Sequence, residues 1–208
     1  MKTMMKNLML FVFVSSVALL GCKSSTPTKT IENLKAGIKG ETTASAKYAA
    51  FAQKAMEEGY DTIAKLFEAV SKAEAIHADN HRKALEDLGQ KMEDFTPTFD
   101  VKSTAENLQA AIDGETYETE TMYVQFLEDA NTEKVEQAIK SFTWAFDTEK
   151  KHLDFYTKAL EALKLNKENA LPSSYAVCPV CGNTYDNASV DQNCAFCQAP
   201  KEKFIVIN

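Results

Sequence analysis

The sequence predicts a mainly α protein, with a four-helix bundle followed by a small C-terminal metal-knuckle domain. The first observation is an internal repeat, because Glu74-Ala-Ile-His77 returns 75 positions later as Glu149-Lys-Lys-His152. The second is composition, since 208 residues with 45% hydrophobic content but only 7 Gly and 5 Pro suit one helical core and a minor appendage. The third is a pair of Cys-x-x-Cys motifs near the C-terminus, which is typical of a metal site.

Residues 1–21 have the build of a secretory signal peptide. Two lysines precede an apolar run, Leu8 to Leu20, that is too short to cross a bilayer comfortably. The run ends in Leu19-Leu20-Gly21-Cys22, which resembles the lipobox of bacterial lipoproteins, a family in which this cysteine is lipidated. We therefore expect an exported protein, anchored to a membrane only through Cys22 on a periplasmic face or cell surface, with residues 22–30 as a tether. An ordinary cleaved signal peptide or a buried cysteine is the alternative.

Residues 31–165 show helical spacing in four segments. We expect helices over about 31–58, 61–88, 103–131 and 132–165, the third beginning at a capping box, Ser103-x-x-Glu106. The first and third turns are short and the middle link is longer. This order predicts a four-helix bundle of the ferritin-like type.

The predicted helices carry a ligand set for two metal ions. Glu and His three residues apart lie on one helix face. A di-iron carboxylate bundle takes one Glu from each of two helices and a Glu-x-x-His from each of the other two. Several buried carboxylates would be costly as bare charges, so divalent iron or manganese would neutralise them. The expected ligands are Glu41, Glu74, His77, Glu118, Glu149 and His152, with Glu115 as a fifth carboxylate.

Three further residues lie at helical spacing from these ligands. Tyr48 and Tyr123 are expected either to fill the core or to form a hydrogen bond to a ligand carboxylate. His81, four residues after His77, falls on nearly the same stripe. For His81 we expect a polar or surface role rather than a place among the ligands.

The helical pattern stops at residue 166, and residues 166–176 are predicted to be a linker. Residues 177–208 hold four cysteines as two Cys-x-x-Cys pairs: Cys178, Cys181, Cys194 and Cys197. Four thiolates at this spacing favour a tetrahedral site for zinc or a single iron. Two disulfides are the alternative in an exported protein.

The stretch Cys178-x-x-Cys181-Gly182-x-x-Tyr185 resembles the first knuckle of rubredoxin, and a ferritin-like bundle followed by such a domain resembles rubrerythrin. The resemblance implies a peroxidase in which a reduced di-iron centre converts hydrogen peroxide to water with electrons relayed through a rubredoxin-like iron. It further implies that Glu74 and Glu149 bridge the two irons. It also implies that Glu115 and His77 exchange as ligands of one iron.

Alternatives to a peroxidase remain at this point. One is a ferroxidase that handles iron, and another is a tethered electron-transfer or metal-binding lipoprotein. A net charge of −7 argues against a nucleic-acid partner. The electron donor is not named by the sequence. Because the linker is short, we expect a head-to-tail homodimer in which each knuckle domain serves the partner's di-iron site.

Overall fold

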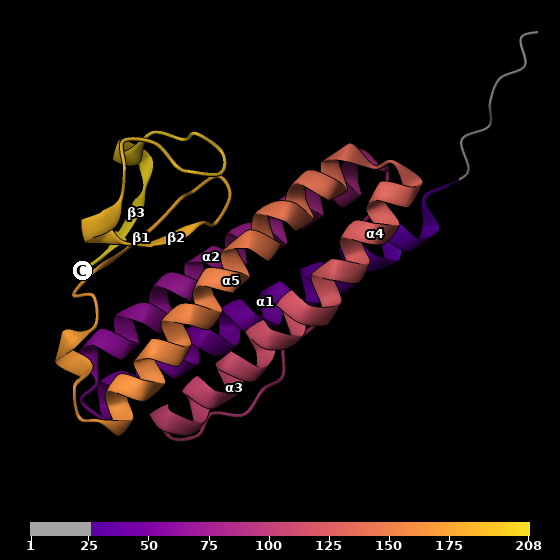
Figure 1. The fold of residues 1–208 in the computed structure, drawn as a ribbon. Helices are drawn as coiled ribbons and strands as arrows, with labels where there is room; N and C mark the ends of the chain where they lie inside the picture. Colours follow the sequence, from indigo (N-terminus) through magenta and orange to yellow (C-terminus); the bar gives the residue numbers. More distant parts are fainter. Residues whose placement is uncertain (1–25) are drawn as a thin grey trace, which may run out of the picture.

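The computed structural model describes residues 26–208, which form a helical bundle with a small sheet domain on its side (Figure 1). The helical elements are α1 (Thr28–Glu57), α2 (Asp61–Asp87), α3 (Thr104–Tyr117), the π-helical turn η1 (Glu118–Met122), α4 (Tyr123–Glu133) and α5 (Glu136–Lys164). The segment η1 joins α3 and α4 into one rod, so the bundle has four rods, as the sequence predicts. A long link from Leu88 to Ser103 crosses between the two helical hairpins.

The helix ends are stabilised by groups that lie far away in the sequence. The Glu133 carboxylate accepts hydrogen bonds from the backbone N–H groups of Lys29 and Thr30 at the start of α1. The predicted capping box of Ser103 and Glu106 is present at the start of α3. The predicted start of the last helix at residue 132 is wrong, because Lys134 adopts a left-handed conformation (φ 58°) that ends α4 and delays α5 to Glu136.

Two apolar clusters fill the bundle on either side of a polar layer. On α1, for example, Leu34 and Ile38 belong to one cluster, and Tyr48 and Phe51 belong to the other. The buried Glu41 lies between them in the sequence. The same order recurs on the other rods, so each rod brings its acidic residues to the middle of the bundle, where apolar side chains exclude water from above and below.

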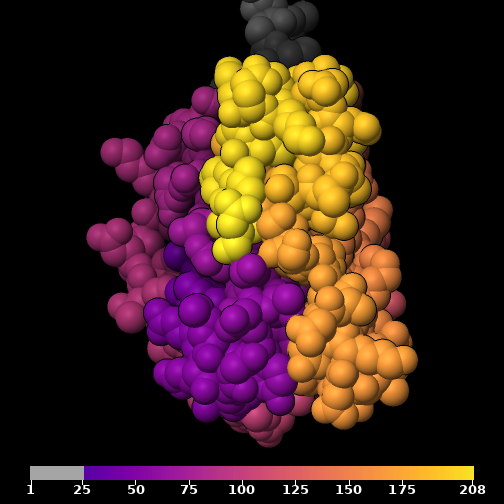
Figure 2. Space-filling view, turned by 90° about the vertical axis from the view of Figure 1, so that its left-hand side faces the viewer, coloured from indigo at the N-terminus to yellow at the C-terminus, as the bar shows by residue number. Residues whose placement is uncertain are grey.

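The C-terminal domain is a three-stranded antiparallel sheet with strand order β2-β1-β3. Its strands are β1 (Tyr175–Val177), β2 (Thr184–Asp186) and β3 (Ile205–Ile207), and three short 3₁₀ turns accompany them: η2 (Glu168–Ala170), η3 (Asn187–Ser189) and η4 (Lys201–Lys203). β1 begins inside the segment predicted as linker. Figure 2 shows this domain, in yellow, seated directly on the helices.

The linker does not separate the two domains. Its backbone carbonyls accept hydrogen bonds from Thr62 and Lys65, so the chain turns back at the end of α5 and runs along α2. The expectation that a short linker keeps the knuckle domain from its own bundle is therefore wrong. The homodimer itself stays a prediction, without this geometric reason for it.

Among residues 26–208 there is no helix that is both long and apolar enough to span a bilayer. The predicted signal peptide and Cys22 lie outside the described residues.

Candidate metal centres

The middle of the bundle holds two overlapping groups of metal-ligating side chains. In each group the ligand atoms lie within 4.8 Å of one another. Glu74 and Glu149 belong to both groups, and all members are buried. The first group is Glu41, Glu74, His77 and Glu149, and the second is Glu74, Glu115, Glu149 and His152. The structure thus brings six of the seven predicted bundle ligands together.

Glu74 and Glu149 lie between the two imidazoles. His77 Nδ1 is 2.9 Å from one oxygen of Glu74 and 2.9 Å from one oxygen of Glu149. His152 Nδ1 is 3.2 Å and 2.6 Å from the other oxygen of each. Each carboxylate therefore faces both histidines, which is the arrangement required of a carboxylate that serves two ions.

The two tyrosines each form a hydrogen bond to a carboxylate on a different rod. Tyr48 donates to Glu115 Oε1 at 2.9 Å, and Tyr123 donates to Glu41 Oε1. Both rings are also buried among aromatic neighbours, so the two roles that the sequence left open coexist. The hydroxyls orient the carboxylates from behind.

The π-helical turn η1 explains an irregular spacing that sequence reasoning missed. Glu41 and Tyr48 are seven residues apart on α1, whereas Glu115 and Tyr123 are eight apart on the third rod. A π turn accommodates one extra residue in a helix and is often found at a functional site. Because η1 lies between Glu115 and Tyr123, it absorbs that residue and restores the match between the two rods.

Glu118 stands apart from the other predicted ligands. It lies on η1, is half-buried and belongs to neither group. Burial, followed by the charge of Glu149, raises its pKa well above the usual value. Glu115 shares its group with His152 and not with His77. The expected exchange of Glu115 and His77 at one metal position stays a prediction.

His81 is buried and hydrogen-bonded, so of the two expected alternatives the polar role is confirmed and the surface role is wrong. Its Nε2 lies 2.9 Å from the Tyr123 hydroxyl and its Nδ1 lies 2.6 Å from Ser141 Oγ. It belongs to neither metal group, as expected. Its position four residues after His77, on the buried face of the helix, is the signal that could have predicted its burial.

The pKa shifts in the polar layer of the bundle show that its buried carboxylates need nearby positive charge to stay ionised. Burial raises the pKa of Glu41 and Glu115 well above the usual value, and neighbouring carboxylates, with Glu118 first among them, add to the effect. Burial also opposes ionisation of Glu74, but the imidazoles, led by His152, outweigh it and hold the pKa of Glu74 at about 2. Burial lowers the pKa of His152, yet Glu74 and Glu149 outweigh it and raise that pKa to about 9.

The donor set fits two divalent cations. Seven side-chain atoms in this layer are buried without a well-directed hydrogen bond, although some lie close to one another: Glu41 Oε2, Glu74 Oε1, Glu115 Oε2, both oxygens of Glu149, His77 Nε2 and His152 Nδ1. Unpartnered buried polar atoms are costly. All of these atoms except His77 Nε2 are carboxylate oxygens or an imidazole Nδ1, which are atoms that bind metal ions. Two cations would therefore satisfy most of them at once.

The four cysteines of the knuckle domain form a second site. All four sulfurs lie within 4.8 Å of one another and are free thiols rather than disulfides. Cys178 and Cys197 are 3.4 Å apart at Sγ, as are Cys181 and Cys194. A tetrahedral site with metal–sulfur bonds of about 2.3 Å has edges of roughly 3.8 Å. The sulfurs are therefore arranged for one metal ion.

The loop after Cys181 lies directly on the bundle layer. A Cβ added at Gly182 would lie 2.3 Å from His77 Nε2, so this glycine permits the close approach. Thr184 Oγ1 is 2.9 Å from His152 Nε2, and Lys151 Nζ donates to Asn183 Oδ1 at 2.6 Å. Both imidazoles therefore contact the same short loop that carries one of the metal-binding cysteines.

The comparisons with known proteins agree with this architecture. The family model for rubrerythrin matches residues 32–160. Nigerythrin of Nitratidesulfovibrio vulgaris is 36% identical over 84% of this chain and 85% of its own length, and rubrerythrin-2 of Clostridium acetobutylicum is 34% identical over 84% and 95%. A solved structure of fully reduced, all-ferrous nigerythrin has a TM-score of 0.76 at 34% identity and covers 91% of each chain.

These matches establish the nature of the two sites. The bundle layer is a di-iron carboxylate site, and the four cysteines form the rubredoxin-like metal site. The chain belongs to the rubrerythrin family, whose members are generally oxidoreductases.

Proposed function

We propose that this protein reduces hydrogen peroxide to water with electrons that pass through the four-cysteine site. The observation that carries the proposal is the contact between the two sites, in which the loop from Gly182 to Thr184 touches both His77 and His152. An iron-handling protein has no need for a redox centre against its di-iron ligands. The same contact disfavours the ferroxidase alternative.

The reaction consumes two electrons and two protons per peroxide and yields two waters. Bound at these ligands, ferrous iron would supply the electrons for O–O cleavage. Glu74 and Glu149 hold the two positions together. Tyr48 and Tyr123 orient the terminal carboxylates, and the apolar clusters above and below limit access of water.

The path for electrons is short and lies within one chain. Cys181 is followed directly by Gly182, which packs against His77, and then by Asn183 and Thr184, which lead to His152. The Asn183 carbonyl also accepts a hydrogen bond from the backbone N–H of Cys178. Covalent bonds and hydrogen bonds therefore link two of the cysteines to His152, and Gly182 lies against His77 without a hydrogen bond.

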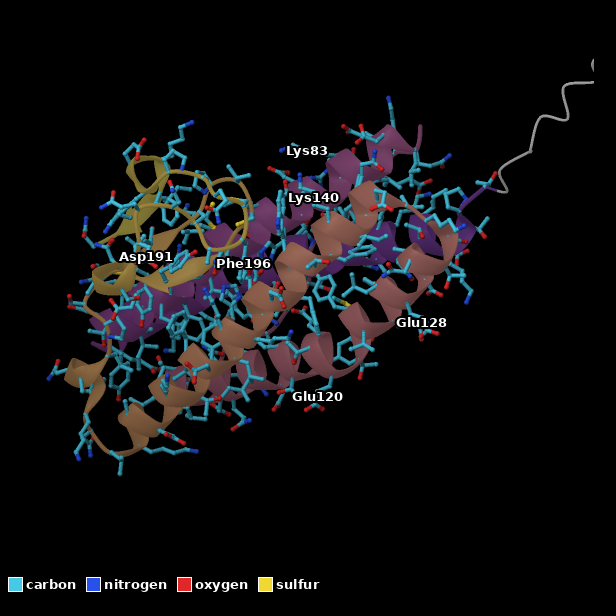
Figure 3. The ribbon with its side chains drawn as sticks, turned by 45° about the horizontal axis from the view of Figure 1, so that its top comes forward. Lys83, Glu120, Glu128, Lys140, Asp191 and Phe196 are labelled. Atoms are coloured by element: carbon cyan, nitrogen blue, oxygen red, sulfur yellow. The ribbon has the colours of Figure 1, made fainter. Side chains whose placement is uncertain are left out.

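The experiment is peroxide reduction by the iron-loaded, reduced protein with an artificial electron donor. Glu74→Ala and Glu149→Ala should each abolish turnover, because each carboxylate serves both ions. Glu120→Ala, on the exposed face of η1, is the matched control and should keep full activity. Figure 3 shows Glu120 on the outside of the bundle. If the reduced unmutated protein consumes peroxide no faster than free ferrous iron, the proposed function is wrong.

We also propose that the reaction takes place outside the cytoplasm on a lipid-anchored protein. The support is the lipobox-like stretch ending in Cys22, which lies outside the described residues. Cys22→Ala should move the protein from the membrane fraction to the soluble fraction with its visible spectrum unchanged. An unmodified protein that already fractionates as soluble would contradict the proposal.

A further inference from the structure

A chain of buried hydrogen bonds runs from the di-iron ligand Glu41 toward the surface. Tyr123 donates to Glu41 Oε1, His81 Nε2 lies 2.9 Å from the Tyr123 oxygen, and His81 Nδ1 lies 2.6 Å from Ser141 Oγ. Tyr123 and His81 are completely buried and Ser141 is 5% exposed. Its four members lie on the four rods of the bundle, one on each, which makes the chain a structural feature of the whole fold.

The donors in this chain all point the same way. Because Tyr123 donates its only proton to Glu41, its oxygen must accept from His81, which therefore carries its proton on Nε2. Nδ1 is then an acceptor and Ser141 donates to it. Burial supports this neutral form, since it lowers the pKa of His81 to about 3. Every proton is thus directed toward Glu41.

The outer end of the chain reaches a hollow on the surface between α2 and α5. Ser141 lines this hollow together with Lys83, Ala84 and Lys140. Figure 3 shows Lys83 and Lys140 close together on the outside of these two helices. Water in the hollow can therefore exchange protons with the Ser141 hydroxyl.

The internal repeat offers a comparison, because the hydrogen-bond chain behind Glu41 has no equivalent behind Glu115. At the offset of 75 residues, His81 corresponds to Tyr156, and Tyr123 corresponds to Tyr48. Tyr48 donates to Glu115, but the Tyr156 hydroxyl has no hydrogen-bond partner. Helix packing alone therefore does not account for the linked donors behind Glu41.

We propose that Ser141, His81 and Tyr123 form a proton relay that supplies the di-iron site through Glu41. When Glu41 passes a proton to the reacting oxygen, Tyr123 donates its proton to Glu41 and takes one from His81 Nε2. His81 then takes a proton at Nδ1 from Ser141, which is resupplied by water. Each group ends with as many protons as it had. One passage supplies one of the two protons of peroxide reduction and leaves the His81 proton on Nδ1, and the inference rests on the proposed function.

The sharpest variant is His81→Gln, because it keeps both hydrogen bonds and stops the relay. The amide can donate to Tyr123 and accept from Ser141, but it does not pass a proton between its nitrogen and oxygen. Ser141→Ala removes the outer donor, and Ser141→Thr is the conservative replacement that restores it. Thr143→Val, which removes a hydroxyl that bonds only within α5, is the control outside the relay.

The first readout is single-turnover oxidation of the reduced holoprotein by peroxide in H₂O and D₂O. His81→Gln and Ser141→Ala should slow oxidation at least about tenfold and increase the solvent isotope effect, since proton transfer by a positioned group contributes about 10²–10⁴-fold. Ser141→Thr should recover the rate. Iron content and visible spectrum should match those of the Thr143→Val control. If His81→Gln reacts at the unmutated rate with the same isotope effect, the relay is refuted.

The second readout does not depend on peroxide. In the resting holoprotein with ¹³C-labelled histidine, infrared difference spectra follow the N–H to N–D exchange of His81 after transfer into D₂O, with His81→Gln as the subtraction reference. Exchange should be slower in Ser141→Ala than in Ser141→Thr. Equal exchange in the two variants would overturn the relay. An unmutated protein that exchanges through Ser141 but leaves peroxide intact would instead contradict the proposed function alone.

Discussion

Gly182 is the position where one added methyl group should separate the two metal sites. Its φ is +81°, a conformation that costs an L-residue about 1–2 kcal/mol. The new Cβ would also lie 2.3 Å from His77 Nε2 and 3.1 Å from the Ala73 carbonyl oxygen. The imidazole is held at Nδ1 by the bundle layer and the carbonyl belongs to α2, so the knuckle loop has to lift. Gly182→Ala should therefore loosen the domain from the bundle.

Gly59→Ala is the matched control for this substitution. Gly59 has nearly the same conformation, with φ +84°, but no atom lies within 4 Å of the position of its added Cβ. It should therefore suffer the backbone strain alone. The difference between the two variants in free energy of unfolding measures the contact with His77.

The functional assay is transfer of an electron from the four-cysteine iron to the di-iron site. The four-cysteine iron is reduced by a flash, and recovery of its thiolate-to-iron absorption is followed. Transfer should be slower in Gly182→Ala than in Gly59→Ala, because the electronic coupling between two redox centres weakens as the distance between them increases. If Gly182→Ala transfers electrons as fast as Gly59→Ala, the contact does not carry the electrons.

Three further predictions follow from individual contacts. Tyr185→Phe removes an O–H···S hydrogen bond of 3.4 Å to Cys194 Sγ. It should lower the one-electron reduction potential of the four-cysteine iron by roughly 20–65 mV, measured in a voltammetric titration. An unchanged potential would mean that this hydrogen bond does not tune the iron. In the metal-free protein, the raised pKa of His152 gives a stabilisation that is complete below pH 6.5 and is lost as the pH rises to about 9. The free energy of unfolding in denaturant should therefore fall by roughly 3 kcal/mol over this range, and loading with iron should remove the pH dependence. Gly37→Ala would place a Cβ 2.9 Å from the His81 ring and should lower the free energy of unfolding. Gly40→Ala, whose added Cβ has no atom within 4 Å, should leave it unchanged or raise it. Equal free energies of unfolding for the two variants would mean that the His81 ring moves aside freely.

The sequence was sufficient to predict the bundle and the composition of its polar layer because both depend on local patterns. Glu74 and His77 share a helix face through their spacing, and the repeat at Glu149 and His152 identifies the partner rod without any structure. The four-cysteine site is likewise written in two short motifs. Such patterns depend on helix and turn geometry, which varies little between proteins.

The features that could not be predicted depend on contacts across the fold. Lys134 takes a left-handed conformation that its side chain does not favour, so the start of α5 was placed too early. The π turn η1 becomes evident only when Tyr123 is known to bind Glu41. The length of the linker does not reveal its direction, which is set by hydrogen bonds to α2 that turn the chain back at the end of α5.

The most direct test of the central claim is an electron count in a single turnover. The anaerobic protein, with all of its iron reduced, is mixed with one equivalent of hydrogen peroxide in a stopped-flow spectrometer. The account predicts that two electrons leave the protein for each peroxide consumed, and that the four-cysteine iron becomes oxidised as it refills the di-iron site. A four-cysteine iron that stays reduced while the di-iron site remains oxidised would contradict the relay of electrons between the two sites.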